Sequence, residues 1–277
     1  MKNPISPVQY QFFQNGNQEE INASLIVETP VSLTVNGTVW LTFMCTPTQL
    51  EALAVGFLFN EGVIKDFSEV ADVRVCEHGD NVDVWLNHTT EKPTKWTHTS
   101  GCTGGVTSVE PNVDMEPVRH LNGVTLSPEQ IPALLELLNG DQTLYRQTGG
   151  VHTSVLSDGK RSVISAEDIG RHNTLDKIAG TALMKKITLE RRIILTTGRI
   201  SSDMMQKSLQ LGALIIISRT SPSSMSVELA EKQGITLIGY AKRHRFNVYT
   251  HPERIVSVEK LTSSDKEEIH DQSQDTL

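Results

Sequence analysis

The second half of the chain repeats a strand–loop–helix pattern, and this repeat restricts the possible folds more than any other feature. An apolar run at residues 192–197 is followed by a polar loop and a helix over 203–211. The same order follows with a strand at 213–217 and a helix at 225–232, and a third strand is predicted at 235–240. Alternation of this kind is typical of a parallel or mixed sheet with helices on its faces. Ligands bind such sheets at the carboxyl ends of the strands, where both loops are expected.

The first half of the chain is predicted to be rich in β-strands. Short β-rich runs precede Asn36-Gly37, a strong hairpin turn signal, and residues 38–43 alternate as a returning strand should. Thr46-Pro47 is predicted to begin a helix, with Thr46 as its N-cap, and Glu61-Gly62 to end it. Two further strands are predicted between residues 70 and 86.

These patterns predict an α/β protein, α+β overall, with a β-rich N-terminal part and a C-terminal α/β domain that contains a mixed sheet. In chain order we expect a flexible arm (1–20), a β-rich N-terminal domain (21–125) with a glycine-rich loop near 100–105, the α/β domain (126–262) and a disordered tail (263–277).

One segment, residues 167–177, concentrates two carboxylates, a glycine, an arginine, a histidine and an amide, followed by an aspartate and a lysine. Apolar residues at helical spacing from Leu175 onward predict an amphipathic helix with this polar segment at its N-terminus. Free backbone N–H groups and the helix dipole favour an anion there. Because buried polar groups cost free energy unless they are paired, the segment indicates either a solvated loop or a binding site.

The two loops of the strand–loop–helix units carry groups that suit phosphate recognition. Arg199 and Arg219 occupy matching places, each followed by several hydroxyl groups just before a helix. Serines such as Ser201 and Ser223 could equally be ordinary helix N-caps, so both interpretations remain open. Neither a P-loop nor a dinucleotide fingerprint is present. The basic run at 242–245 could clamp phosphates or form a solvated patch.

The charge balance limits the classes of partner. A formal net charge of -8 argues against a general affinity for nucleic acid or for an anionic membrane. No apolar run approaches the roughly 20 residues needed to span a bilayer, and residues 1–16 show no signal-peptide pattern. We therefore expect a cytoplasmic protein that binds neither nucleic acid nor membrane.

The three cysteines, Cys45, Cys76 and Cys102, form neither a disulfide framework nor a C-x-x-C zinc motif. Cys45 and Cys76 lie in or beside apolar strands and are predicted to be inert. Cys102 lies between glycines, which suits either a thiol that a partner protein must reach or an incidental surface cysteine. His152 lacks the glutamate that zinc deaminases carry two residues later, so no zinc is expected.

Several motifs together resemble the FdhD family, the formate dehydrogenase accessory sulfurtransferases. The resemblance extends from about residue 28 to residue 252. It is carried by Glu28-Thr29-Pro30-Val31, Val35-Asn36-Gly37, Thr46-Pro47, Gly56-Phe57-Leu58, Glu61-Gly62-Val63-Ile64, Thr148-Gly149-Gly150-Val151-His152, Glu167-Asp168-Ile169-Gly170-Arg171-His172-Asn173, Thr197-Gly198-Arg199-Ile200-Ser201 and Asn247-Val248-Tyr249-Thr250.

The resemblance implies a C-terminal domain like that of cytidine deaminases, without the zinc chemistry. It also implies a sulfur carrier, which accepts persulfide sulfur from a cysteine desulfurase and transfers it to the bis-molybdopterin guanine dinucleotide cofactor of formate dehydrogenase. Cys102 matches the family's carrier cysteine. Many members carry Cys-x-x-Cys in this loop, whereas Gly105 stands here at the second position, so no resolving thiol is available there. A homodimer is also expected from the family.

The resemblance places the cofactor-binding segment at Tyr240, Ala241, Lys242, Arg243, His244 and Arg245. With the motifs above, further contacts to the cofactor are expected from Gly149, Gly150, His152, Asp168, Gly170, Arg171, His172, Asn173, Asp176, Lys177, Gly198, Arg199, Ser201 and Arg219. Asp168 and Asp176 could accept hydrogen bonds from guanine, or could cap a helix or pair with Arg171 or Lys177.

Two rival functions remain. A non-catalytic chaperone that binds the cofactor or the formate dehydrogenase apoprotein would not need Cys102. A nucleotide-modifying enzyme on a deaminase-like scaffold would need zinc ligands that the sequence lacks.

Overall fold

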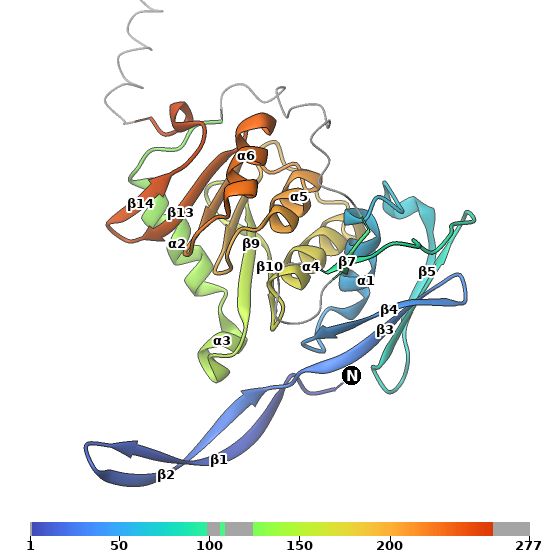
Figure 1. Cartoon of the computed structure of the whole chain (residues 1–277), viewed down its shortest axis with the longest axis horizontal. Helices are drawn as coiled ribbons and strands as arrows, with labels where there is room; N and C mark the ends of the chain where they lie inside the picture. Colours follow the sequence, from blue (N-terminus) through green and yellow to red (C-terminus); the bar gives the residue numbers. More distant parts are fainter. Residues whose placement is uncertain (1, 99–105, 109–123, 257–277) are drawn as a thin grey trace, which may run out of the picture.

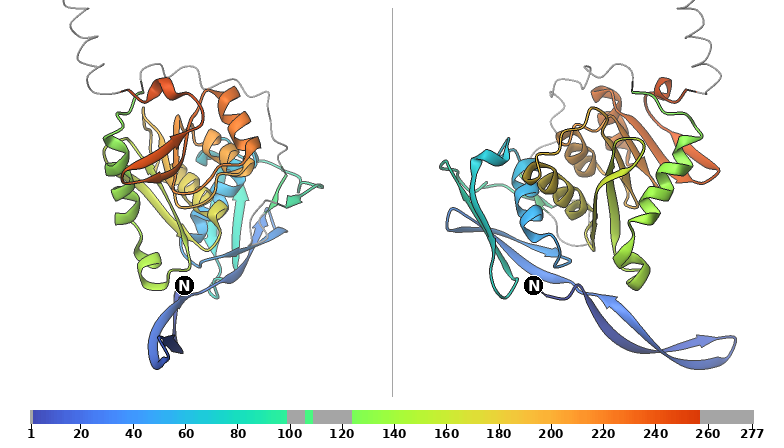
Figure 2. Two further views of the ribbon diagram at one scale, coloured as in Figure 1. Left: turned by 60° about the vertical axis from the view of Figure 1, so that its left-hand side comes forward. Right: turned by 180° about the vertical axis from the view of Figure 1, so that it is seen from behind.

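The computed structural model describes residues 2–98, 106–108 and 124–256 of the 277-residue chain (Figure 1). A large α/β domain carries a smaller sheet domain at one side, and a long two-stranded hairpin projects from the two (Figures 1 and 2). The predicted tail, residues 263–277, lies outside the described residues.

The smaller domain is a four-stranded sheet covered on one face by helix α1 (Leu50–Asn60). Its strands, in sheet order, are β4 (Thr38–Cys45), β3 (Thr29–Val35), β6 (Asn81–Leu86) and β5 (Val70–Val75). The predicted Asn36-Gly37 turn joins β3 and β4, and both of its residues have a positive φ, as a tight hairpin turn requires. Leu53 and Phe57 of α1 are buried against β-strand residues such as Leu33.

The larger domain contains the predicted mixed sheet. Its strands, in sheet order, are β10 (Ser162–Asp168), β9 (His152–Ser157), β11 (Ile193–Thr196), β12 (Ile215–Ser218), β13 (Thr236–Lys242) and β14 (Arg245–Val248). β11, β12 and β13 are parallel, and the other pairings are antiparallel. Every residue of β11 and β12 is buried, which explains why these strands are continuous apolar runs without alternation.

Helices cover both faces of the large sheet (Figures 1 and 2). α4 (Arg171–Met184), α5 (Ser202–Gln210) and α6 (Ser224–Gln233) pack on one face, where Leu175 and Met205 are buried. The other face is covered by α2 (Gln130–Gly140). The shorter elements are α3 (Thr143–Thr148), η1 (Phe67–Glu69), η2 (Pro252–Arg254), β7 (Thr97–His98) and β8 (Val106–Thr107).

Two glycines allow α1 and α4 to pack with their backbones in contact. A Cβ atom on Gly56 of α1 would overlap the Asp176 carbonyl oxygen, and one on Gly180 of α4 would overlap the Ala52 carbonyl oxygen. The two helix backbones therefore touch where they cross, so that α1 belongs to both domain cores.

The prediction of a flexible arm over residues 1–20 is wrong. β1 (Ile5–Gln14) pairs antiparallel with β2 (Asn17–Ile26) along its whole length. The hairpin turns at Asn15-Gly16, the same signal as Asn36-Gly37, with positive φ at both residues. The strands escaped prediction because the segment is mostly polar and exposed, and its alternation at Val8, Tyr10 and Phe12 is short.

The predicted start of the first helix is also wrong. α1 begins at Leu50 after Gln49, which has a left-handed backbone conformation, and not at Pro47. The Thr46 hydroxyl accepts a hydrogen bond from the Ile169 N–H in the other domain and does not cap the helix. Within the part of the chain that is described, no helix has the length and apolar character needed to cross a membrane.

Candidate ligand-binding site

The two predicted loops meet at the carboxyl ends of β11 and β12. The Ile200 N–H donates to the Ser221 carbonyl (3.2 Å), and the Ser223 N–H donates to the Ile200 carbonyl (2.9 Å). The Ser218 hydroxyl donates to the Gly198 carbonyl (2.7 Å) and ties the end of β12 to the neighbouring loop. The loops therefore form one rigid rim, and a cavity opens on each side of it.

The first cavity has a volume of about 550 Å³. Five of its lining residues were predicted, namely Gly149, Gly150, His152, Arg219 and Lys242. Sequence analysis missed Gln142, Tyr145, Val151, Ile169, Thr197 and Thr220. Arg219 and Lys242 are exposed cations that line this cavity, which suits a phosphorylated ligand.

His152 is neutral in this cavity. Its Nδ1 lies 3.4 Å from the Thr197 hydroxyl, and its side chain is partly buried. Burial lowers the pKa of His152, and the Arg171 guanidinium lowers it further. A neutral imidazole can both donate and accept a hydrogen bond, so His152 can position a ligand without adding charge.

The second cavity, of about 280 Å³, lies on the other side of the rim. It is lined by Arg171, Arg199, Ile200, Ser201, Ser221, Pro222 and Ser223. Ser201 accepts a hydrogen bond from the Met204 N–H, and Ser223 accepts one from the Ser226 N–H, so both serines cap helices. The two serines can cap their helices while an anion binds here, because Arg199 is exposed beside the start of α5.

His172 lies behind this cavity and is buried. Its Nε2 is 3.4 Å from the Ser201 hydroxyl and 3.9 Å from Asp203 Oδ2. Burial lowers the pKa of His172 to about 2, with further lowering by Arg171 and Lys207. The imidazole is therefore neutral, and it supports the start of α5 from within the protein.

Asp168, Lys177 and Asn173 are bonded to one another inside the protein and line neither cavity, so the alternative of a pair between Asp168 and Lys177 is the one observed. Lys177 Nζ donates to Asp168 Oδ2 (2.6 Å), and both side chains are fully buried. Asn173 donates to Asp168 Oδ1 (2.9 Å) and to the Met44 carbonyl (3.0 Å). Lys177 also donates to the Thr46 carbonyl (3.1 Å), so this cluster joins the two domains.

Asp176 is likewise internal, and its ion pair is with Lys207 and not with Arg171 or Lys177, the two partners considered from the sequence. Its Oδ1 accepts hydrogen bonds from Lys207 Nζ (2.5 Å) and from the Asn60 amide (2.7 Å). Burial raises the pKa of Asp176, and the Lys207 ammonium opposes that rise. The helix expected to be amphipathic is thus buried along its first three turns, and its polar side chains are paired inside the protein.

Glu167 has a structural role that the sequence did not reveal. Its carboxylate accepts hydrogen bonds from the N–H groups of Thr143 (2.9 Å), Leu144 (2.7 Å) and Tyr145 (2.9 Å). This carboxylate satisfies the first N–H groups of α3, the helix that ends at Gly149 beside the first cavity.

The remaining predicted residues divide between the interior and the surface. Gly198 packs against the Arg171 side chain, and Gly170 donates its N–H to Asp168 Oδ1 (2.8 Å). In the basic segment, Ala241 is buried, and Tyr240, Arg243, His244 and Arg245 are exposed at the β13–β14 hairpin. Of that segment, Lys242 is the residue that lines the first cavity.

Cys102 lies outside the described residues, but the chain on both sides of it is placed. Thr97 pairs with Thr107 across the short β7–β8 ladder. The Ser108 N–H and hydroxyl donate to Glu61 at 2.6 Å and 2.7 Å, and the Trp96 ring stacks on Phe57 of α1 with centroids 6.1 Å apart. Both flanks are therefore attached to α1.

The other two cysteines differ from each other. Burial raises the pKa of Cys45 to about 12, which makes its thiol inert, as predicted. Cys76 is half-buried and donates to Asp80 (2.9 Å), so it is not a core residue. Among the described residues, no group of three His, Cys, Asp or Glu side chains could hold a metal ion.

Comparison with known proteins gives consistent matches over nearly the whole chain. The model of the FdhD/NarQ family matches residues 26–256. "Sulfur carrier protein FdhD" of Staphylococcus haemolyticus is 33% identical over 251 residues, which cover 89% of this chain and 95% of that protein. The same-named protein of Staphylococcus aureus (strain MRSA252) is 32% identical over 252 residues, with 90% and 95% coverage.

A solved structure also resembles the chain. The crystal structure of a protein described as a formate dehydrogenase accessory protein, from Desulfotalea psychrophila, superimposes with a TM-score of 0.77 at 30% identity. The match covers 92% of this chain and 100% of the other. This likeness supports the mixed α/β architecture and the strand-rich N-terminal part.

Proposed function

Because this chain belongs to the FdhD/NarQ family, we propose that it is a sulfur carrier which serves formate dehydrogenase through the molybdenum cofactor. In this proposal, Cys102 accepts persulfide sulfur from a cysteine desulfurase. The protein then transfers that sulfur to bis-molybdopterin guanine dinucleotide, which it binds as a substrate. The names of its relatives, a sulfur carrier protein and a formate dehydrogenase accessory protein, support sulfur transfer in aid of that enzyme.

The two cavities suit the anionic arms of such a substrate. Arg219 and Lys242 border the first cavity, and Arg171 and Arg199 border the second. One guanidinium group can bind two phosphate oxygens at once. The starts of α5 and α6 add backbone N–H groups nearby. A pyrophosphate at the rim would lie between cations from both sides.

A buried amide supports ligand binding most directly. Gln142 is 5% exposed and lines the first cavity, and within the described chain its Nε2 donor has no hydrogen-bond partner. A buried donor without an acceptor costs free energy, so such groups are rare unless a ligand completes them. Carbonyl and phosphate oxygens of a guanine nucleotide are suitable acceptors. Since Asp168 and Asp176 are paired internally, we assign them no contact with guanine.

Cys102 is suited to its proposed role by its position in the chain. It lies four positions after His98 and four positions before Val106, which belong to the paired strands β7 and β8. Its thiolate would attack the outer sulfur of the desulfurase persulfide, and the desulfurase thiolate would leave as the S–S bond breaks. One thiol suffices for this exchange, which agrees with Gly105 in place of a second cysteine.

We also propose, from the family resemblance, that the chain acts in the cytoplasm and works as a homodimer. The client is formate dehydrogenase, and the sulfur donor is a cysteine desulfurase.

The proposal is tested by intact-protein mass spectrometry after incubation with a cysteine desulfurase and cysteine. The wild type should gain one sulfur, about 32 Da, as the persulfide form of Cys102. Cys102→Ser should gain none, and Cys76→Ser, the matched control, should gain sulfur as the wild type does. Equal gain in Cys102→Ser, or no gain in any variant, would favour the non-catalytic chaperone.

A further inference from the structure

The projecting hairpin, here called the arm (residues 5–26), carries apolar side chains on one face. Its register places Val8 opposite Ala23 and Tyr10 opposite Ile21, and Phe12 follows on the same face. The middle of the other face is polar, with a hydrogen bond from Gln9 to Glu20 (2.8 Å) and another from Gln11 to Glu20 (3.2 Å), and Phe13 lies on this second face beside the turn. At the tip, Phe12 is 41% exposed and Phe13 is 67% exposed. Large aromatic side chains this exposed on a two-stranded hairpin point to a contact with another molecule.

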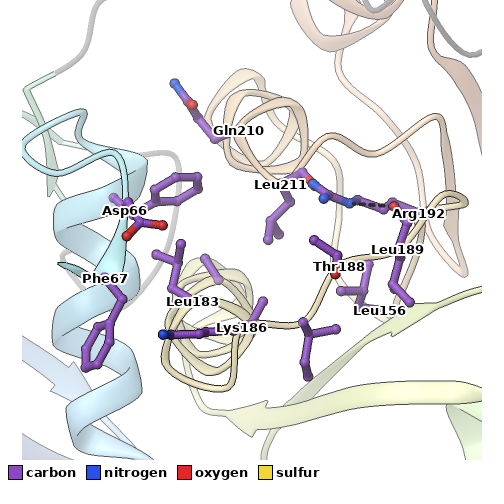
Figure 3. A pocket seen from close by; sticks show the side chains of 14 residues that line it. Asp66, Phe67, Leu156, Leu183, Lys186, Thr188, Leu189, Arg192, Gln210 and Leu211 are labelled. Carbon is purple, nitrogen blue, oxygen red and sulfur yellow. Dashed lines mark hydrogen bonds between the residues drawn. The ribbon is translucent and has the colours of Figure 1, made fainter.

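A separate apolar pocket of about 400 Å³ lies between the ends of α4 and α5 and the residues after α1 (Figure 3). Its walls are mostly aliphatic and aromatic, including Phe67, Leu156, Leu183, Leu189 and Leu211. None of its lining residues belongs to the two cavities at the carboxyl ends of the strands. Its volume is large enough to accept an aromatic side chain.

The arm does not fill this pocket within one molecule. It projects away from the body, and the pocket lies among α4, α5 and the segment after α1 (Figures 1 and 2). Within the described residues, no segment fills the pocket, which leaves it available to another molecule.

Charge complementarity identifies the arm of a second copy as that occupant. Residues 3–27 contain two acidic residues, Glu19 and Glu20, and no lysine or arginine. Lys186 and Arg192 line the pocket, and the segment that carries them, residues 185–192, contains four basic residues and one acidic residue. In Figure 3, Lys186 extends along the pocket beside Phe67. The acidic Asp66 at the opening is already held by the Ser68 N–H, to which it is hydrogen-bonded (2.8 Å).

We propose that the tip of the arm of one copy, Phe12-Phe13, inserts into the α4–α5 pocket of a second copy, with Glu19 beside Lys186 of that copy. Reciprocal exchange of two arms would give a closed twofold dimer with two identical contacts. The contact would bury the aromatic side chains that the isolated arm exposes and would stabilise a hairpin that is marginal alone. This inference specifies the interface of the proposed homodimer and does not depend on sulfur transfer.

Site-specific photo-crosslinking of the full chain tests the contact directly. A benzophenone amino acid replaces Phe13, an exposed position where the change leaves the fold intact, and ¹⁵N-labelled protein is mixed with unlabelled protein. Crosslinks between labelled and unlabelled copies are expected, at residues 183–192 or 210–211. Crosslinks to other surfaces, crosslinks only within one copy, or the absence of crosslinks would overturn the proposal.

Analytical ultracentrifugation of variants provides the second test. Phe13→Ala should weaken self-association at least about tenfold, because a buried aromatic side chain is lost. Met225→Ala, a matched change at an exposed apolar residue on α6, should have no effect.

A charge exchange distinguishes this interface from any other dimer. Glu19→Lys and Lys186→Glu should each weaken association about threefold or more, and the double variant should recover most of it. Self-association unchanged in Phe13→Ala, or no recovery in the double variant, would contradict the arm–pocket contact even if the protein is dimeric. Persulfide formation on Cys102 is measured in a separate experiment, and its result neither supports nor contradicts the arm–pocket contact.

Discussion

Replacing Lys177 by methionine should test what holds the two domains together. Methionine has a similar length but no charge, so the change removes the ammonium and little else. Lys177 Nζ donates to Asp168 Oδ2 (2.6 Å), to the Thr46 carbonyl (3.1 Å), to the Thr48 hydroxyl (3.2 Å) and to the Glu167 carbonyl (3.2 Å). The first partner is a carboxylate with 0% side-chain exposure, which would be left without its counter-ion.

The magnitude follows from that uncompensated charge. Removing one partner of a buried ion pair costs about 3–5 kcal/mol, whereas replacing both partners by neutral groups is often close to neutral. In a chain of this size, each kcal/mol lowers Tm by about 2–4 °C. Lys177→Met should therefore lower Tm by roughly 6–20 °C.

Urea unfolding followed by circular dichroism measures the loss. The double variant Asp168→Asn/Lys177→Met should be more stable than Lys177→Met by at least about 1 kcal/mol, because no buried charge remains. Lys232→Met, at an exposed lysine of α6, controls for the substitution itself. If Lys177→Met loses less than about 1 kcal/mol, or if the double variant is no better, the buried pair does not hold the domains as described.

Three further predictions follow from the packing and from the site. Gly180→Ala should prevent stable folding, because the added Cβ would overlap the Ala52 carbonyl. Gly140→Ala should be neutral or slightly stabilising, because no atom lies within 4 Å of the added Cβ. Thermal melts compare the two variants. The pKa of folded His172, about 2, lies below its unfolded value, so the unfolded chain binds the extra proton, and stability falls as the pH drops below 6.5. Between pH 6.5 and 5 the resulting loss of stability is about 2 kcal/mol. His172→Asn should therefore make the urea midpoint depend less on pH in that range. An unchanged dependence of the urea midpoint on pH would contradict the burial of a neutral imidazole. Gln142→Leu should weaken the binding of GDP about three- to tenfold in calorimetry with an unchanged Tm, whereas equal affinity would show that the amide does not reach the ligand.

The large sheet could be predicted because its signals are local. β11 and β12 are buried on both faces, so residues 193–196 and 215–218 are short apolar runs, and each is followed by a serine that caps the next helix. The arm was missed because its alternation of Val8, Tyr10 and Phe12 with polar residues is short and lies in a mostly polar segment, although Asn15-Gly16 gave the turn signal.

The candidate site was predicted in part for similar reasons. Arg199 and Arg219 follow strands directly, so their place at the rim can be deduced from the alternation alone. Lys177, nine residues from Asp168, was one of the partners considered for that carboxylate, but Thr46 could not be deduced as the other, because it lies in the other domain. Gln142 belongs to no motif, and its importance depends on the burial and the missing partner that only the fold reveals.

Transfer of labelled sulfur tests the central claim most directly. The protein is loaded by a cysteine desulfurase with ³⁵S-cysteine, separated from the donor, and mixed with bis-molybdopterin guanine dinucleotide that lacks its sulfur ligand and with formate dehydrogenase that lacks the cofactor. We predict that the label passes to the cofactor and that formate oxidation appears in proportion, with wild type and Cys76→Ser but not with Cys102→Ser. Activation by Cys102→Ser, or activation by the wild type without transfer of the label, would contradict a sulfur carrier that acts through Cys102.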